Sequence, residues 1–349
     1  MFDRLIRHFS NDIGIDLGTA NTLVYLRGRG VVINEPSVVA LNAKTDRVVA
    51  VGTEAKNMMG RTPSHIRIVR PLVDGVISDY EVTEEMLSYL INKANDMDKK
   101  FFRPRVVIGI PVGVTNVEMR AVYDAAKSAG AREVYIVEEP MAAAIGVHLP
   151  IHEPIGSMII DIGGGTTDIA VIALGGVVRS KSLKVAGDMM NTNIITYIRD
   201  EFKMLIGEKT SEHIKMTIGS AAPGGEGEEM NVKGRDLVTG LPREAVITDV
   251  DIREAMYGPI SQIIEATKEV LETTPPEVLS DIMHKGITLS GGGALIRNLP
   301  ILLQTQLKVP ITVADDPLTC VARGTGVILE DIDLYNDVVI QNTDDISFR

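Results

Sequence analysis

The chain has no tryptophan, few aromatic residues and a single cysteine. Among its 349 residues, aromatic side chains account for 4%, and the one cysteine is Cys320. A single cysteine excludes an internal disulfide and is typical of a protein from a reducing compartment. The shortage of aromatic rings leaves no evident platform on which nucleic-acid bases could stack.

Positive charge and long apolar runs are also scarce. Lysine and arginine number 35 against 47 aspartates and glutamates, which gives a net charge of -12. An acidic chain is poorly suited to nucleic acid, whose phosphates require a basic face. No apolar run approaches the ~18 residues that span a bilayer, and Asp3, Arg4 and Arg7 interrupt the first apolar stretch. We therefore expect a cytoplasmic protein without a signal peptide.

Two common nucleotide-binding motifs are missing, but another pattern occurs twice. There is no G-x-x-x-x-G-K-[ST] loop, and neither Gly18 nor Gly163 begins a G-x-G-x-x-G. Instead, a strand-like apolar run is followed first by Asp16-Leu17-Gly18-Thr19-Ala20-Asn21-Thr22 and later by Asp161-Ile162-Gly163-Gly164-Gly165-Thr166-Thr167. A third glycine cluster, Ser290-Gly291-Gly292-Gly293-Ala294, also follows a strand-like run.

These loops have the chemistry of a phosphate-binding site. Glycines let backbone N–H groups approach phosphate oxygens, and successive N–H groups form an anion-binding nest. Asp16 and Asp161 would repel phosphate directly, so we expect them to hold Mg²⁺, which keeps several of its waters. The alternative is that these segments are ordinary glycine-rich turns. The predicted phosphate-binding residues are Gly18, Thr19, Ala20, Asn21, Gly163, Gly164 and Gly165.

The three loops together resemble those of the superfamily that contains actin, sugar kinases and heat-shock chaperone ATPases. Within it, the chain resembles the MreB family of bacterial actin homologues over essentially its whole length. Several longer segments carry this resemblance: N-E-P-S-V-V-A at 34–40, V-E-E-P-M-A-A-A-I-G at 137–146, L-P-I-H-E-P at 149–154, T-P-P-E at 274–277 and D-D-P-L-T at 315–319.

The resemblance implies roles for further residues. Glu139 would orient the attacking water, with Thr166, or Thr167 in its place, as the second positioning residue. Glu212 and Lys215 would flank the adenosine of ATP, and Gly291, Gly292, Gly293 and Ala294 would lie beneath the adenine. From the residues alone, Glu139 is equally a carboxylate favoured at a helix N-terminus. Glu212 and Lys215 are likewise an ordinary surface pair at i,i+3 spacing.

The expected fold is α/β and actin-like, with two related lobes and the nucleotide in the cleft between them. Alternating strand-like and helix-like segments after each phosphate loop indicate the two related halves. The resemblance implies a smaller inserted subdomain in each half. The expected division is residues 1–32, 71–145 and 312–349 for subdomain IA, 33–70 for IB, 146–181 and 244–311 for IIA, and 182–243 for IIB.

Two segments have the pattern of membrane contacts. In residues 1–9, the apolar Phe2, Leu5, Ile6 and Phe9 fall on one face at helical spacing, opposite basic residues. Such a helix suits an anionic lipid surface. The second is the pair Phe101-Phe102, flanked by basic residues; the resemblance implies that this loop joins the helix in the membrane. For residues 1–9, the alternative is a helix that docks on its own domain. For Phe101 and Phe102, the alternative is that they begin a strand and face the core.

The resemblance implies a bacterial cytoskeletal filament protein that maintains rod shape by organising cell-wall synthesis, with slow ATP hydrolysis controlling assembly. Its partners would be other copies of itself in antiparallel double protofilaments, the anionic inner face of the membrane, and membrane-bound cell-shape and wall-synthesis proteins. The alternatives are a sugar or acid kinase, for which Asp188 is the available base, and a chaperone ATPase. The last would need a peptide-binding domain beyond Arg349.

Overall fold

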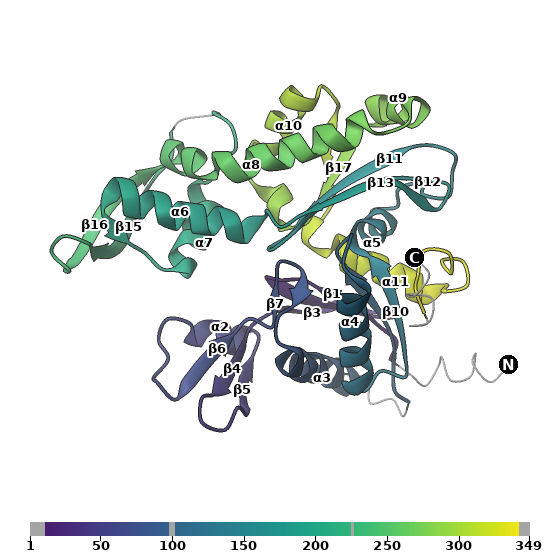
Figure 1. The fold of residues 1–349 in the computed structure, drawn as a ribbon, viewed down its shortest axis with the longest axis horizontal. Helices are drawn as coiled ribbons and strands as arrows, with labels where there is room; N and C mark the ends of the chain where they lie inside the picture. Colours follow the sequence, from purple (N-terminus) through teal and green to yellow (C-terminus); the bar gives the residue numbers. More distant parts are fainter. Residues whose placement is uncertain (1–10, 98–101, 225–226, 342–349) are drawn as a thin grey trace.

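The structure is a computed structural model that describes residues 11–97, 102–224 and 227–341. The chain forms two lobes, each built on a five-stranded mixed sheet (Figure 1). In the first lobe, the strand order is β3-β2-β1-β9-β10. These strands are β1 (Ile13–Leu17), β2 (Asn21–Leu26), β3 (Gly30–Pro36), β9 (Arg105–Ile110) and β10 (Glu133–Glu138).

The second lobe repeats this topology. Its sheet has the order β13-β12-β11-β17-β18, so in both lobes an antiparallel three-stranded meander is extended by two parallel strands. The two-lobed α/β organisation predicted from the repeated loops is confirmed. The strands are β11 (Ser157–Ile162), β12 (Thr167–Ala173), β13 (Gly176–Leu183), β17 (Ile287–Ser290) and β18 (Ile311–Val313).

Helices cover the outer face of each sheet. In the first lobe these are α3 (Tyr80–Asp96) and α4 (Asn116–Ser128); in the second, α8 (Asp249–Glu272), α9 (Pro276–Lys285) and α10 (Leu299–Leu307) (Figure 1). Their amphipathic faces bury two separate apolar cores, one for each lobe. Two short 3₁₀ helices, Gly292–Leu295 and Pro317–Thr319, complete the second lobe.

The helices α5 (Glu139–Gly146) and α11 (Cys320–Glu330) cross between the lobes. Helix α5 follows the first sheet but packs on β11 and β12, whereas α11 follows the second sheet and packs on β1 and β9. Their crossing is very close, because a Cβ atom on Gly324 would overlap the backbone of Ala142. A third apolar core, which includes the buried Cys320, joins the two lobes there.

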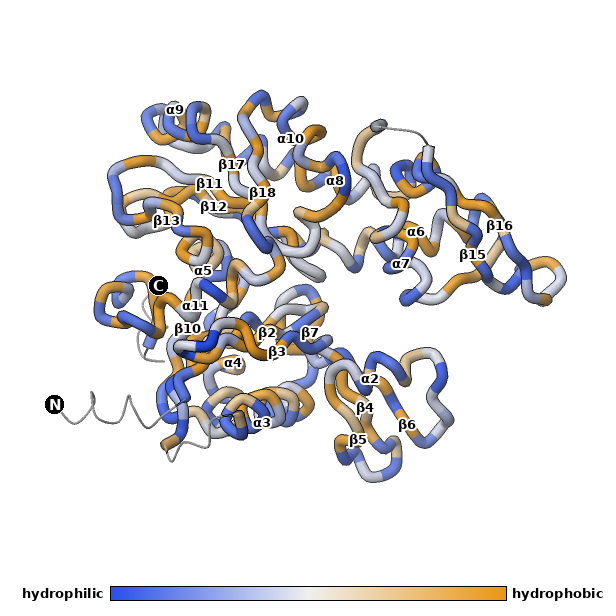
Figure 2. Tube along the Cα trace, turned by 180° about the vertical axis from the view of Figure 1, so that it is seen from behind, coloured by the Kyte–Doolittle hydropathy of each residue, from blue (hydrophilic) through white to orange (hydrophobic). Residues whose placement is uncertain are grey.

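A small subdomain projects from each lobe, and both project towards the same end of the molecule (Figures 1 and 2). In the first lobe it comprises β4 (Val39–Asn42), β5 (Val48–Val51), α2 (Thr53–Met58) and β6 (Ile66–Val69). In the second it comprises α6 (Gly187–Phe202), β14 (Met204–Leu205), α7 (Glu208–Ile218), β15 (Glu229–Asp236) and β16 (Pro242–Thr248). A short hairpin of β7 (Leu72–Val73) and β8 (Val76–Ile77) returns the chain to the first lobe.

The predicted membrane residues are only partly covered by the structure. Phe2, Leu5, Ile6, Phe9 and Phe101 lie outside the described residues. Phe102 is described, and 47% of its surface is exposed, so it does not start a buried strand. None of the helices within the described ranges has the length and apolar character required to cross a bilayer.

Candidate nucleotide-binding site

The first loop is the tip of the β1–β2 hairpin, and contacts from outside the hairpin fix its shape. The Ser37 hydroxyl donates to the carbonyl oxygen of Gly18 at 2.5 Å and lies 2.9 Å from the hydroxyl of Thr22, which is fully buried. The Ser37 N–H donates to the carbonyl of Ala20. Asn21 donates to the side chain of Asn34 at 2.6 Å. The loop is therefore held by the end of β3.

The second loop is the equivalent tip of the β11–β12 hairpin. It is closed by a hydrogen bond from Gly163 N to the carbonyl of Thr166, and the fully buried Thr167 hydroxyl donates to the carbonyl of Val185 at 2.7 Å. The start of α6 holds it from the side. Gly187 N donates to the carbonyl of Gly163 and Asp188 N to that of Gly164.

The two loops touch each other across the cleft. A Cβ atom on Gly164 would lie 2.5 Å from the Cβ of Ala20, and one on Gly165 would lie 2.5 Å from Oγ1 of Thr19. Any larger residue at these two positions would separate the lobes. The glycines predicted for phosphate binding therefore also allow the loops to form one continuous floor.

The third glycine loop lies against the second. Gly291 and Gly293 pack directly on Ile162, the last residue of β11, while Gly292 is exposed and Ala294 is buried. Gly291 has a φ of 78°, a conformation that favours glycine, and its N–H donates to the carbonyl of Pro317. The third loop therefore lies beside the second; that all three bind one ligand stays a prediction.

Four carboxylates converge beside these loops. Asp16 lies on β1, Asp161 on β11, Asp168 on β12, and Glu139 is the first residue of α5. Glu139 and Asp161 are each 6% exposed and Asp168 is fully buried. Asp168 accepts a hydrogen bond from the backbone N–H of Val112 at 2.9 Å, which ties the second lobe's β12 to the first lobe.

Burial raises the pKa of every member of this cluster, and repulsion between the carboxylates adds to the rise for Asp16, Asp168 and Glu139. Loss of solvation raises the pKa of Asp161 to about 6 and that of Asp168 to about 7. Burial, with repulsion from Asp161, raises the pKa of Asp16 to about 8. The pKa of Glu139 is raised well above its ordinary value by burial first, and then by the charges of the three aspartates. Among the described residues, no cation contributes to the pKa shifts of these four groups.

A hydrated Mg²⁺ fits this donor set. Oδ1 of Asp161 and Oδ2 of Asp168 are buried and have no hydrogen-bond partner, so each could accept from a metal-bound water. Within residues 11–97, 102–224 and 227–341, no three acidic, histidine or cysteine side chains converge closely enough to bind a metal directly. This arrangement suits Mg²⁺, which commonly retains waters and uses few protein ligands.

Glu212 and Lys215 lie on α7, at the mouth of the cleft. The Lys215 ammonium donates to the carbonyl of Gly187 at 2.9 Å, and burial lowers the pKa of Lys215. Glu212 pairs with Lys56 of the other lobe's small subdomain at 2.9 Å. The two residues therefore make separate contacts and do not form the i,i+3 surface pair that was the alternative.

Asp168 and Ser37 were not predicted as site residues. Asp168 directly follows the second motif, and its cross-strand partner is Asp161, whereas the equivalent partner of Asp16 is Leu23. A charged residue at the start of an otherwise apolar strand was a signal that could have found Asp168. Ser37 had no such signal, because its contacts with the first loop depend on how β3 ends.

Two repeated α/β lobes, crossed by two exchanged helices and with paired glycine hairpins facing one cleft, define an actin-like protein. The sequence matches the MreB/Mbl protein family over residues 10–337. It is 52% identical to cell shape-determining protein MreB of Escherichia coli (strain K12) over 333 residues, 94% of this chain and 95% of that one. It is 50% identical to cell shape-determining protein Mbl of Bacillus subtilis (strain 168) over 325 residues, 93% of this chain and 97% of that one.

Solved structures agree with this match. MreB5 of Spiroplasma citri bound to ADP is 42% identical and superposes with a TM-score of 0.88, covering 94% of this chain and 98% of that one; a second structure contains AMPPNP. The chain belongs to the MreB/Mbl family, which confirms the resemblance and the actin-like fold predicted from the sequence.

Proposed function

We propose that this chain is an ATP-dependent, actin-like filament protein of the bacterial cytoskeleton that maintains rod cell shape by organising cell-wall synthesis. The main observation in support of this proposal is that two equivalent glycine hairpins meet across the cleft beside four buried carboxylates. Relatives about 50% identical are named cell shape-determining proteins. This family membership favours a filament protein over the alternative, a sugar or acid kinase.

In the proposed site, the loops containing Gly18–Asn21 and Gly163–Gly165 bind the phosphates through backbone N–H groups. Asp16 and Asp161 hold Mg²⁺ through water. Bound Mg²⁺ would neutralise phosphate charge and favour the ionised form of the surrounding carboxyl groups. The crystallisation of MreB5 with ADP and with AMPPNP supports an adenine nucleotide. The adenosine would lie against Gly291, Gly292, Gly293 and Ala294, with Glu212 and Lys215 on its other side.

Slow hydrolysis of ATP to ADP and phosphate would control assembly. Glu139 is the first residue of α5, at the end of β10, and it faces the aspartates of both loops. Once the local charge is neutralised, its carboxylate would orient the attacking water, since phosphoryl transfer depends on in-line positioning. Of the two threonines, we propose Thr166 as the second positioning residue, because the hydroxyl proton of Thr167 is committed to Val185.

We further propose that filaments lie on the inner face of the membrane, as antiparallel double protofilaments, and there meet membrane-bound cell-shape and wall-synthesis proteins. Phe2, Leu5, Ile6 and Phe9, with Phe101 and the exposed Phe102, would enter the lipid. Half-burying four large apolar side chains gains roughly 3–6 kcal/mol, and ordering a terminus costs ~1 kcal/mol or more per residue. Stable binding therefore requires many copies on one filament.

Negative-stain electron microscopy on anionic liposomes, with and without Mg-ATP, tests this proposal. We expect filaments lying on the lipid only when nucleotide is present. Neutral liposomes are the control for the basic residues near Phe101 and Phe102. Dispersed particles that consume ATP only with a sugar or acid acceptor would instead support a kinase. Tight liposome binding by protein kept below its assembly concentration would contradict the dependence of membrane binding on polymerisation.

We also propose that the chain is divided into subdomains IA, IB, IIA and IIB, with the bounds expected from the sequence, and that these meet at the cleft. In this proposal, nucleotide binding brings the two lobes together and favours subunit addition, and hydrolysis with product release loosens the closed state. The filament contacts themselves would then depend on the angle between the lobes.

A further inference from the structure

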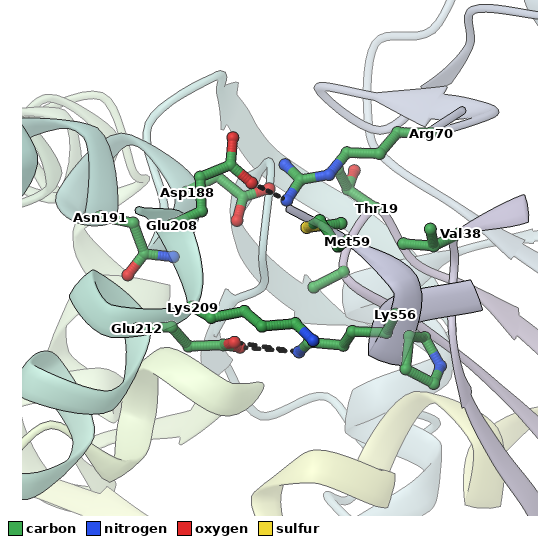
Figure 3. Close-up of a pocket in the computed structure, with 12 residues that line it drawn as sticks. Thr19, Val38, Lys56, Met59, Arg70, Asp188, Asn191, Glu208, Lys209 and Glu212 are labelled. Carbon is green, nitrogen blue, oxygen red and sulfur yellow. Dashed lines mark hydrogen bonds and ion pairs between the residues drawn. The ribbon is translucent and has the colours of Figure 1, made fainter. Parts of the chain in front are cut away.

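Two ion pairs connect the small subdomains across the mouth of the cleft (Figure 3). Lys56 Nζ lies 2.9 Å from a carboxylate oxygen of Glu212, and Arg70 lies 2.6 Å from a carboxylate oxygen of Glu208. Lys56 and Arg70 belong to the first lobe's small subdomain, and both glutamates lie on α7 of the second. Together they close the cleft at the end opposite the crossed helices.

The spacing of these residues makes the two pairs act as one unit. Glu208 and Glu212 are four residues apart on α7, so they lie on one face, one helical turn from each other. Lys56 is on α2 and Arg70 directly follows β6, so the cations come from two different elements. Two contacts one turn apart restrain both the distance of α7 from the first lobe and its rotation.

Behind these pairs lies a small cavity that leads to the phosphate loops. It is lined by Thr19 and Ala20 of the first loop and by Val38 and Met59; Thr19, Val38 and Met59 are labelled in Figure 3. The four charged side chains also line this cavity. The cavity is therefore bordered both by the first phosphate loop and by the two ion pairs.

Helix α7 is also connected to the second phosphate loop. From the next turn of the helix, Lys215 donates to the carbonyl of Gly187, and the Gly187 N–H donates to the carbonyl of Gly163. The neighbouring Asp188 N–H donates to the carbonyl of Gly164. The second loop is thus joined by hydrogen bonds, through the start of α6, to the helix that carries both glutamates.

We propose that Lys56–Glu212 and Arg70–Glu208 form a clasp that holds the cleft closed over bound nucleotide and sets the rate of its release. This inference rests on the proposed nucleotide site. The four side chains are between 33% and 56% exposed, and ion pairs at such exposure are weak. The clasp therefore opens readily, changes the release rate several-fold and weakens as salt is added.

Release of a fluorescent N-methylanthraniloyl-ADP from the full chain, below its assembly concentration, measures the clasp directly. Arg70→Glu and Glu208→Arg should each accelerate release about three- to tenfold, because each places like charges across the cleft. The double exchange should return the rate to within about twofold of the wild type. Neither residue belongs to the proposed nucleotide contacts. Lys56→Glu should have a similar accelerating effect through the second pair.

Arg67→Glu is the matched control. Arg67 pairs with Asp46 at 3.2 Å within the same small subdomain, so the substitution changes the same charge without crossing the cleft. It should leave the release rate unchanged. Equal acceleration by Arg67→Glu, no acceleration by Arg70→Glu, or a double exchange that stays fast would each overturn the clasp alone. No binding of the fluorescent nucleotide to the wild type would overturn the proposed nucleotide site and the clasp together.

Discussion

Asp161 and Asp168 are cross-strand partners on β11 and β12, and each has one buried carboxyl oxygen without a hydrogen-bond partner. In the first lobe, the same register pairs Asp16 with Leu23. The two lobes therefore share a topology but not a charge distribution. The second lobe contributes the additional carboxylate, and a cation with its waters would satisfy both unpartnered oxygens.

Replacing Asp161 with alanine should weaken binding of Mg-ATP itself. The substitution removes one of the two carboxylates proposed to hold hydrated Mg²⁺, and a group that supports a metal site commonly contributes 10–100-fold in affinity. Calorimetric titration with ATP in the presence of Mg²⁺ measures the loss. The same titration with EDTA is the control, and there the mutant and the wild type should differ little. An equal loss under both conditions would mean that Asp161 does not act through the metal.

Replacing Glu139 with alanine should leave ATP binding largely intact and slow hydrolysis by about 100-fold, because loss of a positioning group costs ~10²-fold or more. Phosphate release at saturating ATP is the measurement, and filaments of the mutant should persist longer. Glu138→Gln, at the preceding position, is the matched control and should retain most of the activity. Normal hydrolysis by Glu139→Ala would remove this residue from the proposed mechanism.

The thermal stability of the metal-free protein should fall as the pH rises. In the folded protein the pKa of Asp161 is about 6, that of Asp168 about 7 and that of Asp16 about 8, all above the ordinary value of 3.8. The folded state then binds more protons than the unfolded state between pH ~4 and ~8, so stability decreases over this range.

Melting curves from pH 5 to pH 8, with and without Mg²⁺, measure this effect. Added Mg²⁺ should stabilise the protein more at pH 8 than at pH 5, because the carboxylates it neutralises are then ionised. Asp168→Asn should flatten the pH dependence of the metal-free protein. A melting temperature that rises across this range in the metal-free wild type would contradict the raised pKa values.

Two helical glycines should differ in how much a substitution by alanine changes stability. Gly324→Ala places a Cβ against the backbone of Ala142 at the α5–α11 crossing, and overpacking of this kind typically costs about 1–3 kcal/mol. Gly258 lies within α8, and outside this helix the nearest atom to its added Cβ is the Asn193 amide nitrogen at 3.9 Å. Gly258 also directly precedes Pro259, whose ring crowds a Cβ atom on the preceding helical residue. Gly258→Ala should therefore change the free energy of unfolding little, because this crowding offsets the ~0.5–1 kcal/mol gained in helix propensity. Denaturant unfolding of both variants provides the comparison; destabilisation of similar size in both would contradict the close crossing.

Much of the fold was predictable because its signals are local. The sequence predicts strands over residues 48–51 and 311–313, which are the observed bounds of β5 and β18. It predicts helices over residues 82–94 and 117–129, which agree with α3 and α4 to within two residues at each end. The two phosphate hairpins were recognised because glycine, hydroxyl and carboxylate residues recur at one spacing after a strand. Each of these features depends on neighbours within a few positions.

The missed features all join residues far apart in the chain. Asp168 contacts the N–H of Val112, and Glu212 pairs with Lys56, 156 positions away. No periodicity or motif specifies such a partner, because the contact exists only when both lobes have folded and come together. For the same reason, the prediction that Glu212 flanks the nucleotide did not include its ion pair with Lys56.

The sequence by itself determined the two related α/β lobes, their three glycine loops and the carboxylates at the start of the two phosphate hairpins. Hydrophobic periodicity and turn chemistry act over a few residues, and so they can be recognised along the chain. The tertiary structure alone decided which groups face each other across the cleft: four carboxylates with raised pKa values, two loops in direct contact, and two ion pairs at the mouth. These depend on the packing of the lobes, because burial and distance, which set pKa values and ion-pair strength, arise only after folding.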